Sequence, residues 1–463
     1  WPMCIALRTT FKDDLDVGTN LASWAFKWRS ERVEPGYEWR NQLDAEGPEN
    51  LYPHQRAGVK FLSAVRRGLL CDGLGSGKTY TSFATIDALE KEGKDIYPLL
   101  VVCPNSTKYS WERAIKDINS DVSITVVQGT SVQRKKQFKE FATHNQILIL
   151  NWEALKGHSR IAPFGSNALK RCVECGGKDP KVKEAACQVH EKELNKIDFN
   201  SIIADEAHRM KNGSALATRA LKSATGKAEY RFALTGTPIA NAPDDLWSIL
   251  NWLYPEAYPS HVKFIDRYCD VAFNVWGQPT VTGIRMGMER EFFAGIDPIL
   301  RRMPKEVVLP FLPPVVYERR DVEMSPKQAK AYKQMQEMML AEIDDNLLIN
   351  TNPMTKMTRL LQLASTFMEV EYYEDVDKIT GEPVIKQKVT LTEPSSKLDA
   401  FMDDIESFGE ESVIVFHPYK QVINMLSKRL DKAEIRHGRI TGDEDSMERQ
   451  FHMDQFQEGK TKF

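Results

Sequence analysis

Four short apolar runs, each leading directly into a polar, turn-forming segment, place the strongest limit on the fold of this chain. Short apolar runs without alternation are typical of strands buried on both faces, as in parallel sheets. Stretches with helical spacing lie between the runs, and this alternation predicts an α/β fold with helices on both faces of a parallel sheet. The four runs are Leu99 to Val102, Ile147 to Leu150, Ile202 to Ala204 and Phe232 to Leu234.

Length and composition narrow the classes of protein further. A chain of 463 residues is too long for one hydrophobic core, so we expect two or three domains. No apolar run approaches the roughly 18 residues that a membrane span needs, so no membrane association is expected. The sequence opens without the ordered parts of a secretion signal, which indicates an intracellular protein. Because residue 1 is Trp1 and not Met, we expect further residues upstream.

A glycine-rich loop connects a short apolar strand to the start of a helix between Leu69 and Thr79. Such a loop lets backbone N–H groups surround nucleotide phosphates, and the helix dipole favours the negative charge. Lys78 is expected to reach the β- and γ-phosphates, and the hydroxyl of Thr79 to bind Mg²⁺. The glycines expected to contact the phosphates are Gly73, Gly75 and Gly77.

One position departs from the common phosphate-loop pattern, because Asp72 stands where that pattern has glycine. Two carboxylates at the end of the third apolar run support the nucleotide site nevertheless. Asp205 can hold Mg²⁺, while Glu206 can orient or deprotonate the attacking water, as phosphoryl transfer requires. The pattern therefore predicts an ATP site with catalytic Lys78, Asp205 and Glu206. His208 is either a structural residue or a relay of the nucleotide state.

Two segments at the ends of predicted strands resemble motifs of the Swi/Snf-type ATPases of helicase superfamily two. Residues Asp205 to His208 match the DEAH form of that family's motif II, and Leu234 to Asn241 closely resemble its motif III. Segments that resemble further parts of the family in the same order are Leu51 to Gln55, Val102 to Ser106 with Trp111, Asn151 to Glu153, Trp247 to Pro255, Arg301 to Pro313, Met357 to Leu363, Ser395 to Leu398, Val413 to Tyr419, and Arg439 to Gly442 with Arg449.

This resemblance implies two RecA-like motor lobes, the first built around a phosphate loop. The implied divisions are an N-terminal extension at 1–50, lobe one at 51–255, a helical linker at 256–394, and the start of lobe two at 395–463. The family implies an adenine contact for Gln55, and coupling roles for His208, Thr235 and Thr237. The DNA-binding residues that it implies are Asn105, Thr107, Asn241, Tyr419, Thr441 and Gly442.

The resemblance also implies the function, a DNA-dependent ATPase that converts ATP to ADP and phosphate and tracks along double-stranded DNA. Strand separation is the nearest alternative. Two others are an ATP-gated DNA clamp and a motor subunit of a restriction or repair assembly. A net charge of −3 means that any DNA contact must come from a local basic groove.

The family continues into two later motifs, and the last of them carries arginines that reach the γ-phosphate. The sequence ends at Phe463 before either motif. We therefore expect a further C-terminal segment or a partner protein to supply the arginine finger.

Three of the seven cysteines cluster between two predicted strands of lobe one. Cys172 and Cys175 form one close pair, and after eleven residues Cys187 and His190 form another. Two such pairs are typical of tetrahedral zinc, and four protein ligands leave no open position for catalysis. The spacing thus predicts a small structural zinc insertion at about 170–192, with nearby reduced thiols as the alternative.

Overall fold

The computed structural model describes residues 39–144, 146–161, 170–274, 277–338, 340–343, 346–349, 353–376 and 382–463. The chain divides into two compact units, residues 1–313 and 314–463. The expected boundaries were residues 255 and 395, so the first unit continues well beyond the expected end of lobe one. Residues 1–38 of the expected N-terminal extension lie outside the described residues. Among the helices of the described ranges, none has both the length and the apolar character that a membrane crossing requires.

A seven-stranded parallel sheet forms the centre of the first unit, in the order β3-β4-β2-β5-β6-β1-β9. Four of its strands coincide with the four apolar runs, so the predicted parallel α/β sheet is confirmed. The strands are β1 (Arg67–Leu70), β2 (Leu99–Cys103), β3 (Ile124–Val126), β4 (Ile147–Asn151), β5 (Ser201–Asp205), β6 (Tyr230–Leu234) and β9 (Leu300–Arg301).

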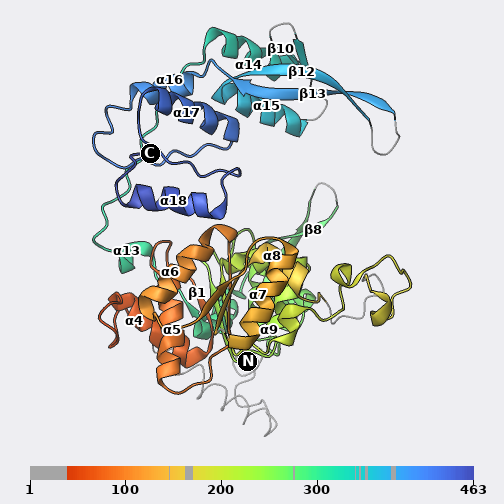
Figure 1. Ribbon diagram of the computed structural model, residues 1–463, viewed down its shortest axis with the longest axis vertical. Coiled ribbons are helices and arrows are strands. Elements are labelled where there is room, and N and C mark those ends of the chain that lie inside the picture. Colours follow the sequence, from red (N-terminus) through yellow and green to blue (C-terminus); the bar gives the residue numbers. More distant parts are fainter. Residues whose placement is uncertain are drawn as a thin grey trace. The chain divides into compact units, whose positions relative to one another are not determined.

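Helices cover both faces of this sheet (Figure 1). Phe61, Phe83 and Trp111 anchor three helices against one face. Phe138 and Leu155 belong to the apolar cluster on the other face. The helices of the first face are α4 (Pro53–Val65), α5 (Lys78–Lys91) and α6 (Lys108–Ile118), and those of the second are α7 (Ser131–His144), α8 (Trp152–His158), α9 (Leu216–Thr225) and α10 (Trp247–Leu253).

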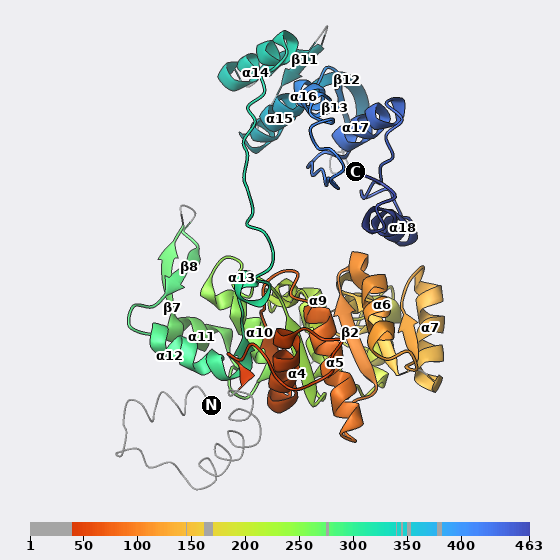
Figure 2. The same cartoon turned by 90° about the vertical axis from the view of Figure 1, so that its left-hand side faces the viewer.

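After α10 the chain leaves the sheet for residues 254–299 and then returns to it as the last strand of the first unit. An antiparallel hairpin lies beside two helices (Figure 2). The chain then enters β9, which pairs in parallel with β1, opposing Leu300 to Leu69 and Arg301 to Leu70. The elements outside the sheet are α11 (His261–Tyr268), β7 (Cys269–Phe273), β8 (Pro279–Ile284), α12 (Glu289–Ile296) and α13 (Lys305–Val308).

The region expected to be a helical linker, 256–394, also contains antiparallel strands. Besides β7–β8, two more strand pairs lie in the second unit. The longer pair is rich in β-branched and aromatic residues, and Glu371 and Lys388 form an ion pair across it at 2.9 Å. The elements here are α14 (Pro326–Met338), β10 (Leu340–Ile343), β11 (Asn346–Ile349), α15 (Pro353–Ser365), β12 (Phe367–Val376) and β13 (Pro383–Thr392).

The remainder of the second unit only partly matches the expected start of a second lobe. Helices α16 (Ser396–Asp403) and α17 (Lys420–Lys432) fall at predicted positions, and α18 (Ser446–Gln457) follows. The strand predicted at Val413 to Phe416 is wrong, since these residues join no ladder among the described residues. At the start of this segment, Val413 N donates a backbone hydrogen bond to Lys462 O at 2.9 Å. Because Ile414 and Phe416 remain 64% and 88% exposed, the apolar pattern alone does not produce a strand here.

Candidate nucleotide site and cysteine cluster

The glycine-rich loop lies between β1 and α5 and adopts a conformation that requires glycine at two positions. Gly75 and Gly77 have φ angles of 83° and 78°, in the left-handed region. Gly77 is also the N-cap of α5. Lys78 Nζ donates hydrogen bonds to the carbonyl oxygens of Asp72 at 2.9 Å and Gly73 at 3.2 Å, so its ammonium group lies across the loop.

Two side chains of α4 hold the loop from outside. His54 Nε2 lies 2.8 Å from the Ser76 carbonyl oxygen, so this nitrogen carries the proton and donates it. Gln55 Nε2 donates to the same oxygen at 3.2 Å. A Cβ atom at Gly77 would lie only 2.2 Å from Gln55 Nε2, which is a second reason for glycine there. The structure therefore places Gln55 against the loop, and it adds His54, which the sequence analysis missed.

The departure from the common loop pattern at Asp72 has a structural explanation. The Asp72 side chain is buried, and its Oδ1 accepts a hydrogen bond from Met303 N at 2.9 Å. Its Oδ2 lies 3.5 Å from Nε of the buried Arg301. Burial raises the pKa of Asp72, and the positive charge of Arg301 opposes that rise. A carboxylate thus fits at position 72 because Arg301 and Met303, far away in the sequence, supply its positive charge and its hydrogen-bond donor.

The two carboxylates predicted to act on ATP lie at the end of β5, with Asp205 as its last residue and Glu206 directly after it. Asp205 Oδ2 accepts a hydrogen bond from Trp111 Nε1 at 2.9 Å, and its Oδ1 accepts one from Glu206 N at 2.9 Å. Burial raises the pKa of Asp205, whereas the Trp111 bond and the nearby charge of Lys78 lower it. Trp152 Nε1 donates to the Asp205 backbone oxygen at 2.9 Å. Two tryptophans therefore fix this strand end.

His208 joins the end of β5 to the end of β6. Its Nδ1 lies 3.1 Å from Thr235 Oγ1 and 3.1 Å from Glu206 Oε2. Thr235 is fully buried, and its Oγ1 also accepts a hydrogen bond from Thr237 N at 3.1 Å. The structure thus joins His208, Thr235, Thr237 and Glu206 in one network of polar contacts. Their coupling roles remain predictions.

The loop after β6 also packs on the phosphate loop. A Cβ atom at Gly236 would lie 2.9 Å from the Leu74 side chain and 3.9 Å from Lys78 Nζ. Thr79 lies in the first turn of α5, next to Lys78. One edge of the sheet therefore gathers an ammonium group, a hydroxyl and two carboxylates, which is the set that Mg²⁺ and a triphosphate require.

The residues expected to bind DNA lie in both units. In the first unit, Asn105 and Thr107 form a 3-10 turn directly after β2. Asn241 is exposed after β6, and its backbone N–H donates to Asp245 Oδ2 at 2.7 Å. The second unit holds Tyr419, Thr441 and Gly442. Their roles in DNA binding remain predictions.

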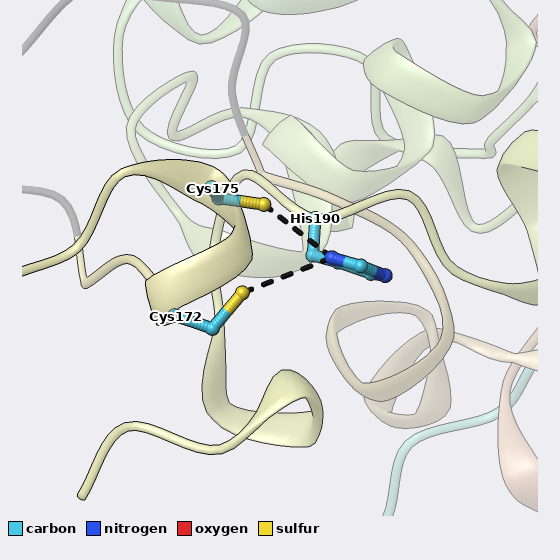
Figure 3. Close-up of side chains that lie close together, drawn as sticks. All are labelled: Cys172, Cys175 and His190. Atoms are coloured by element: carbon cyan, nitrogen blue, oxygen red, sulfur yellow. Dashed lines mark hydrogen bonds between the residues drawn. The ribbon is translucent and has the colours of Figure 1, made fainter. Parts of the chain in front are cut away.

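The cysteine cluster brings together three of its four predicted ligands (Figure 3). His190 Nδ1 lies 3.3 Å from Cys175 Sγ and 3.8 Å from Cys172 Sγ. Candidate ligand atoms of all three residues lie within 4.8 Å of one another. Cys187 does not belong to this group. Its Sγ instead accepts backbone hydrogen bonds from Cys172 N at 3.3 Å and His190 N at 3.2 Å.

The surroundings of the cluster shift the pKa values of two cysteines in opposite directions, and burial together with the neighbouring cysteines raises that of Cys175 to about 12. Burial raises the pKa of Cys187, but backbone N–H donors outweigh it and lower the pKa to about 7. Glu184 Oε1 lies 2.5 Å from His190 Nε2, so this nitrogen donates to the carboxylate while Nδ1 faces the two cysteine sulfurs. A carboxylate that orients a histidine in this way is typical of zinc sites, and the sequence analysis missed Glu184.

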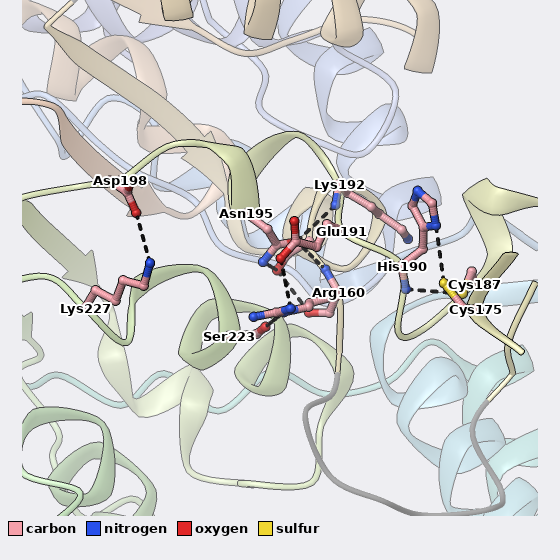
Figure 4. A network of polar contacts seen from close by, with 11 residues as sticks. Arg160, Cys175, Cys187, His190, Glu191, Lys192, Asn195, Asp198, Ser223 and Lys227 are labelled. Atoms are coloured by element: carbon pink, nitrogen blue, oxygen red, sulfur yellow. Dashed lines mark hydrogen bonds and ion pairs between the residues drawn. The ribbon is translucent and has the colours of Figure 1, made fainter.

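Polar contacts tie the insertion to lobe one at its base (Figure 4). Arg160 Nη1 lies 3.0 Å from Glu191 Oε1, and Arg160 Nε donates to Ser223 Oγ of α9 at 3.1 Å. The backbone N–H of Arg160 donates to Asn195 Oδ1 at 2.8 Å. The cluster is thus a separate small element held on the α9 side of the sheet.

Comparison with known proteins relates the chain to one family. Residues 54–370 match the family model described as "SNF2-related domain". The ISWI chromatin-remodeling complex ATPase ISW1 of Saccharomyces cerevisiae is 27% identical over 68% of this chain and 24% of its own length. Protein CHROMATIN REMODELING 5 of Arabidopsis thaliana is 26% identical over 84% of this chain and 21% of its own length. The uncharacterized ATP-dependent helicase MG018 of Mycoplasma genitalium is 23% identical over 85% of this chain and 33% of its own length.

The chain thus spans a third or less of the length of each of these relatives. Among solved structures, the Sulfolobus solfataricus SWI2/SNF2 ATPase core in complex with double-stranded DNA aligns with 89% of this chain. The alignment covers 77% of that structure, with 20% identity and a TM-score of 0.42.

Proposed function

This chain belongs to the family of SNF2-related domains, and from that premise we propose that it is an ATP-driven motor acting on double-stranded DNA. The observation that carries the proposal is the sheet edge where Lys78, Asp205 and Glu206 meet. The charge of Lys78 acts on the Asp205 carboxylate, although 127 positions separate them in the sequence. Such convergence at the carboxyl ends of parallel strands is the usual place for a nucleotide site.

Each residue of this edge takes one part of ATP hydrolysis. The amides of the phosphate loop and Lys78 hold the phosphates, and Thr79 and Asp205 would hold Mg²⁺. A Mg²⁺ ion held there would supply positive charge against the phosphate oxygens. Glu206, next to the metal ligand Asp205, orients the attacking water and accepts its proton. Through His208, the state of Glu206 reaches Thr235 and the loop after β6.

The relatives support DNA as the partner. They include a chromatin-remodeling ATPase and an ATP-dependent helicase. The exposed Asn105 and Asn241, together with the half-buried Thr107, would contact the DNA backbone in the first unit. Translocation along the duplex is the preferred activity, because two of these relatives are named for chromatin remodeling, and strand separation is the alternative.

We also propose that the cysteine cluster binds one structural zinc ion. The three-residue group of Cys172, Cys175 and His190 supplies soft sulfur and imidazole donors that suit zinc. Cys187, whose pKa is lowered to about 7 and whose thiol interacts with those of Cys172 and Cys175, would complete the set as a thiolate. The support is the donor set together with Glu184 on the far side of the imidazole.

The test of the motor proposal measures ATP turnover of the full-length protein with duplex DNA, with single-stranded DNA and without DNA. Lys78→Ala should weaken nucleotide binding, whereas Glu206→Gln should bind MgATP and fail to hydrolyse it. Stimulation by duplex DNA alone supports translocation, and a strand-displacement assay tests the alternative directly. Wild-type turnover in Glu206→Gln would refute the assigned site.

A further inference from the structure

Arg301 is a fully buried arginine at the edge of the sheet, far from the phosphate loop in sequence. It lies in β9, beside β1, and its side chain has 0% exposure. Its guanidinium Nη1 donates to the carbonyl oxygens of Trp39 at 2.7 Å and Arg40 at 3.0 Å. A charge buried this deeply is costly unless hydrogen bonds and an opposite charge compensate it.

The opposite charge belongs to the first residue of the phosphate loop. Nε of Arg301 lies 3.5 Å from Asp72 Oδ2. The backbones interlock as well, because Cys71 N donates to Arg301 O at 2.7 Å and Gly73 N donates to Met303 O at 2.9 Å. The loop therefore begins on a scaffold that the segment 301–303 provides.

A second route leads from Arg301 to the other end of the loop. Its Nη2 donates to the backbone oxygen of His54 at 3.2 Å. The His54 ring in turn donates to the carbonyl oxygen of Ser76 at 2.8 Å, one residue before the N-cap of α5. One guanidinium thus contacts Asp72 at the start of the loop and acts through His54 near its end.

We propose that Arg301 is a positioning residue for the nucleotide site, which sets the shape of the phosphate loop from both ends through Asp72 and His54. Phosphate binding by backbone amides requires their positions to be held within about 0.5 Å, so a rigid loop increases the affinity for nucleotide. A buried ion pair adds little net stability compared with an apolar pair of the same volume. Its use here is therefore geometric, because a forked, planar guanidinium can address several oxygens in fixed directions.

This inference rests on the proposed ATP site, and its test uses nucleotide affinity in place of turnover. The variants are Asp72→Asn, Arg301→Lys and the double variant, with Arg302→Met as the control because Arg302 is the exposed neighbour. Affinity for a fluorescent ADP analogue with Mg²⁺ is titrated alongside the melting temperature. We expect about tenfold weaker binding in each single variant, because each one disrupts the buried ion pair that fixes the start of the loop.

The double variant separates positioning from general stability. If the pair acts as one unit, the double variant should bind about as weakly as either single one, because coupled residues do not add. The inference is overturned if both single variants bind like the wild type, or if affinity falls only in proportion to the unfolded fraction. Should Arg301→Lys not fold, Asp72→Asn decides alone, since Asn keeps the shape and the bond from Met303 N. Wild-type affinity in Lys78→Ala would instead overturn the ATP site itself.

Discussion

The hydrogen bond from Trp111 to Asp205 allows a sharp test of how the candidate Mg²⁺ ligand is held. Trp111 is 1% exposed in α6, and its Nε1 donates to Asp205 Oδ2 at 2.9 Å. Trp111→Phe keeps an aromatic ring in the core but removes the N–H group. The buried carboxylate then loses one of the donors that stabilise its ionised form.

The size and sign of the effect follow from the contact. A hydrogen bond to a charged group contributes about 1.5–3 kcal/mol, so affinity for the Mg²⁺–nucleotide complex should fall about tenfold or more. Burial already raises the pKa of Asp205, and the Trp111 bond lowers it, so the pKa rises further in the variant. Because Mg²⁺ needs the ionised carboxylate, the acid limb of kcat/KM should move to higher pH.

The same shift carries a stability consequence. A carboxyl group whose folded pKa lies above its unfolded value stabilises the fold fully below the unfolded pKa, and this contribution is lost as the pH rises through the folded pKa. Trp111→Phe raises the folded pKa of Asp205 further, so this contribution extends to higher pH. The variant should therefore lose more stability than the wild type on going from acidic to neutral pH.

The assay is the pH profile of kcat/KM for ATP with saturating Mg²⁺, with Trp252→Phe as the matched control. Trp252 is also buried, and its Nε1 donates to Thr225 Oγ1 at 2.9 Å, away from the candidate site. The control should lose stability without moving the acid limb. Identical acid limbs in the wild type and Trp111→Phe would show that Asp205 is not the titrating metal ligand.

Two further predictions concern the zinc cluster and the chain of contacts at β6. Elemental analysis of protein purified without chelators should find about one zinc per chain, and Cys172→Ser should lose it, with new protease sensitivity confined to the insertion. Glu184→Gln, which removes the carboxylate beside His190, should weaken zinc affinity roughly 10- to 100-fold, and an unchanged affinity would contradict its orienting role. Thr235→Val should leave nucleotide affinity within about twofold and reduce DNA-stimulated turnover at least about tenfold, since His208 keeps Glu206 but loses its contact with β6. Full stimulation in this variant would contradict the coupling role.

The fold of the first unit could be predicted where the signal is local. The buried strands at 99–103, 147–151, 201–205 and 230–234 are continuous apolar runs that need no partner to be recognised. The failed strand at Val413 to Phe416 has a similar composition, but its apolar side chains remain largely exposed. Apolar character therefore identifies a strand only where neighbouring strands also pair with it.

The candidate site shows the same division between local and distant information. The phosphate loop and the carboxylates after β5 follow from residue types at short spacing. The contacts of Trp111 with Asp205, and of Arg301 with Asp72, join residues 94 and 229 positions apart. No periodicity or spacing rule links such positions, so these partners emerge only from the packed sheet.

The placement of β9 beside β1 has a consequence for biosynthesis and for the design of shorter fragments. The strand that leads into the phosphate loop finds its outer neighbour about 230 residues later in the chain. At roughly 5–20 residues per second, a ribosome needs on the order of 10–50 s between these two strands. During that interval β1 is an unpaired sheet edge, which is open to incorrect pairing with other chains. A fragment that ended at residue 255 would keep that edge exposed permanently, and it would lack the residues that hold Asp72.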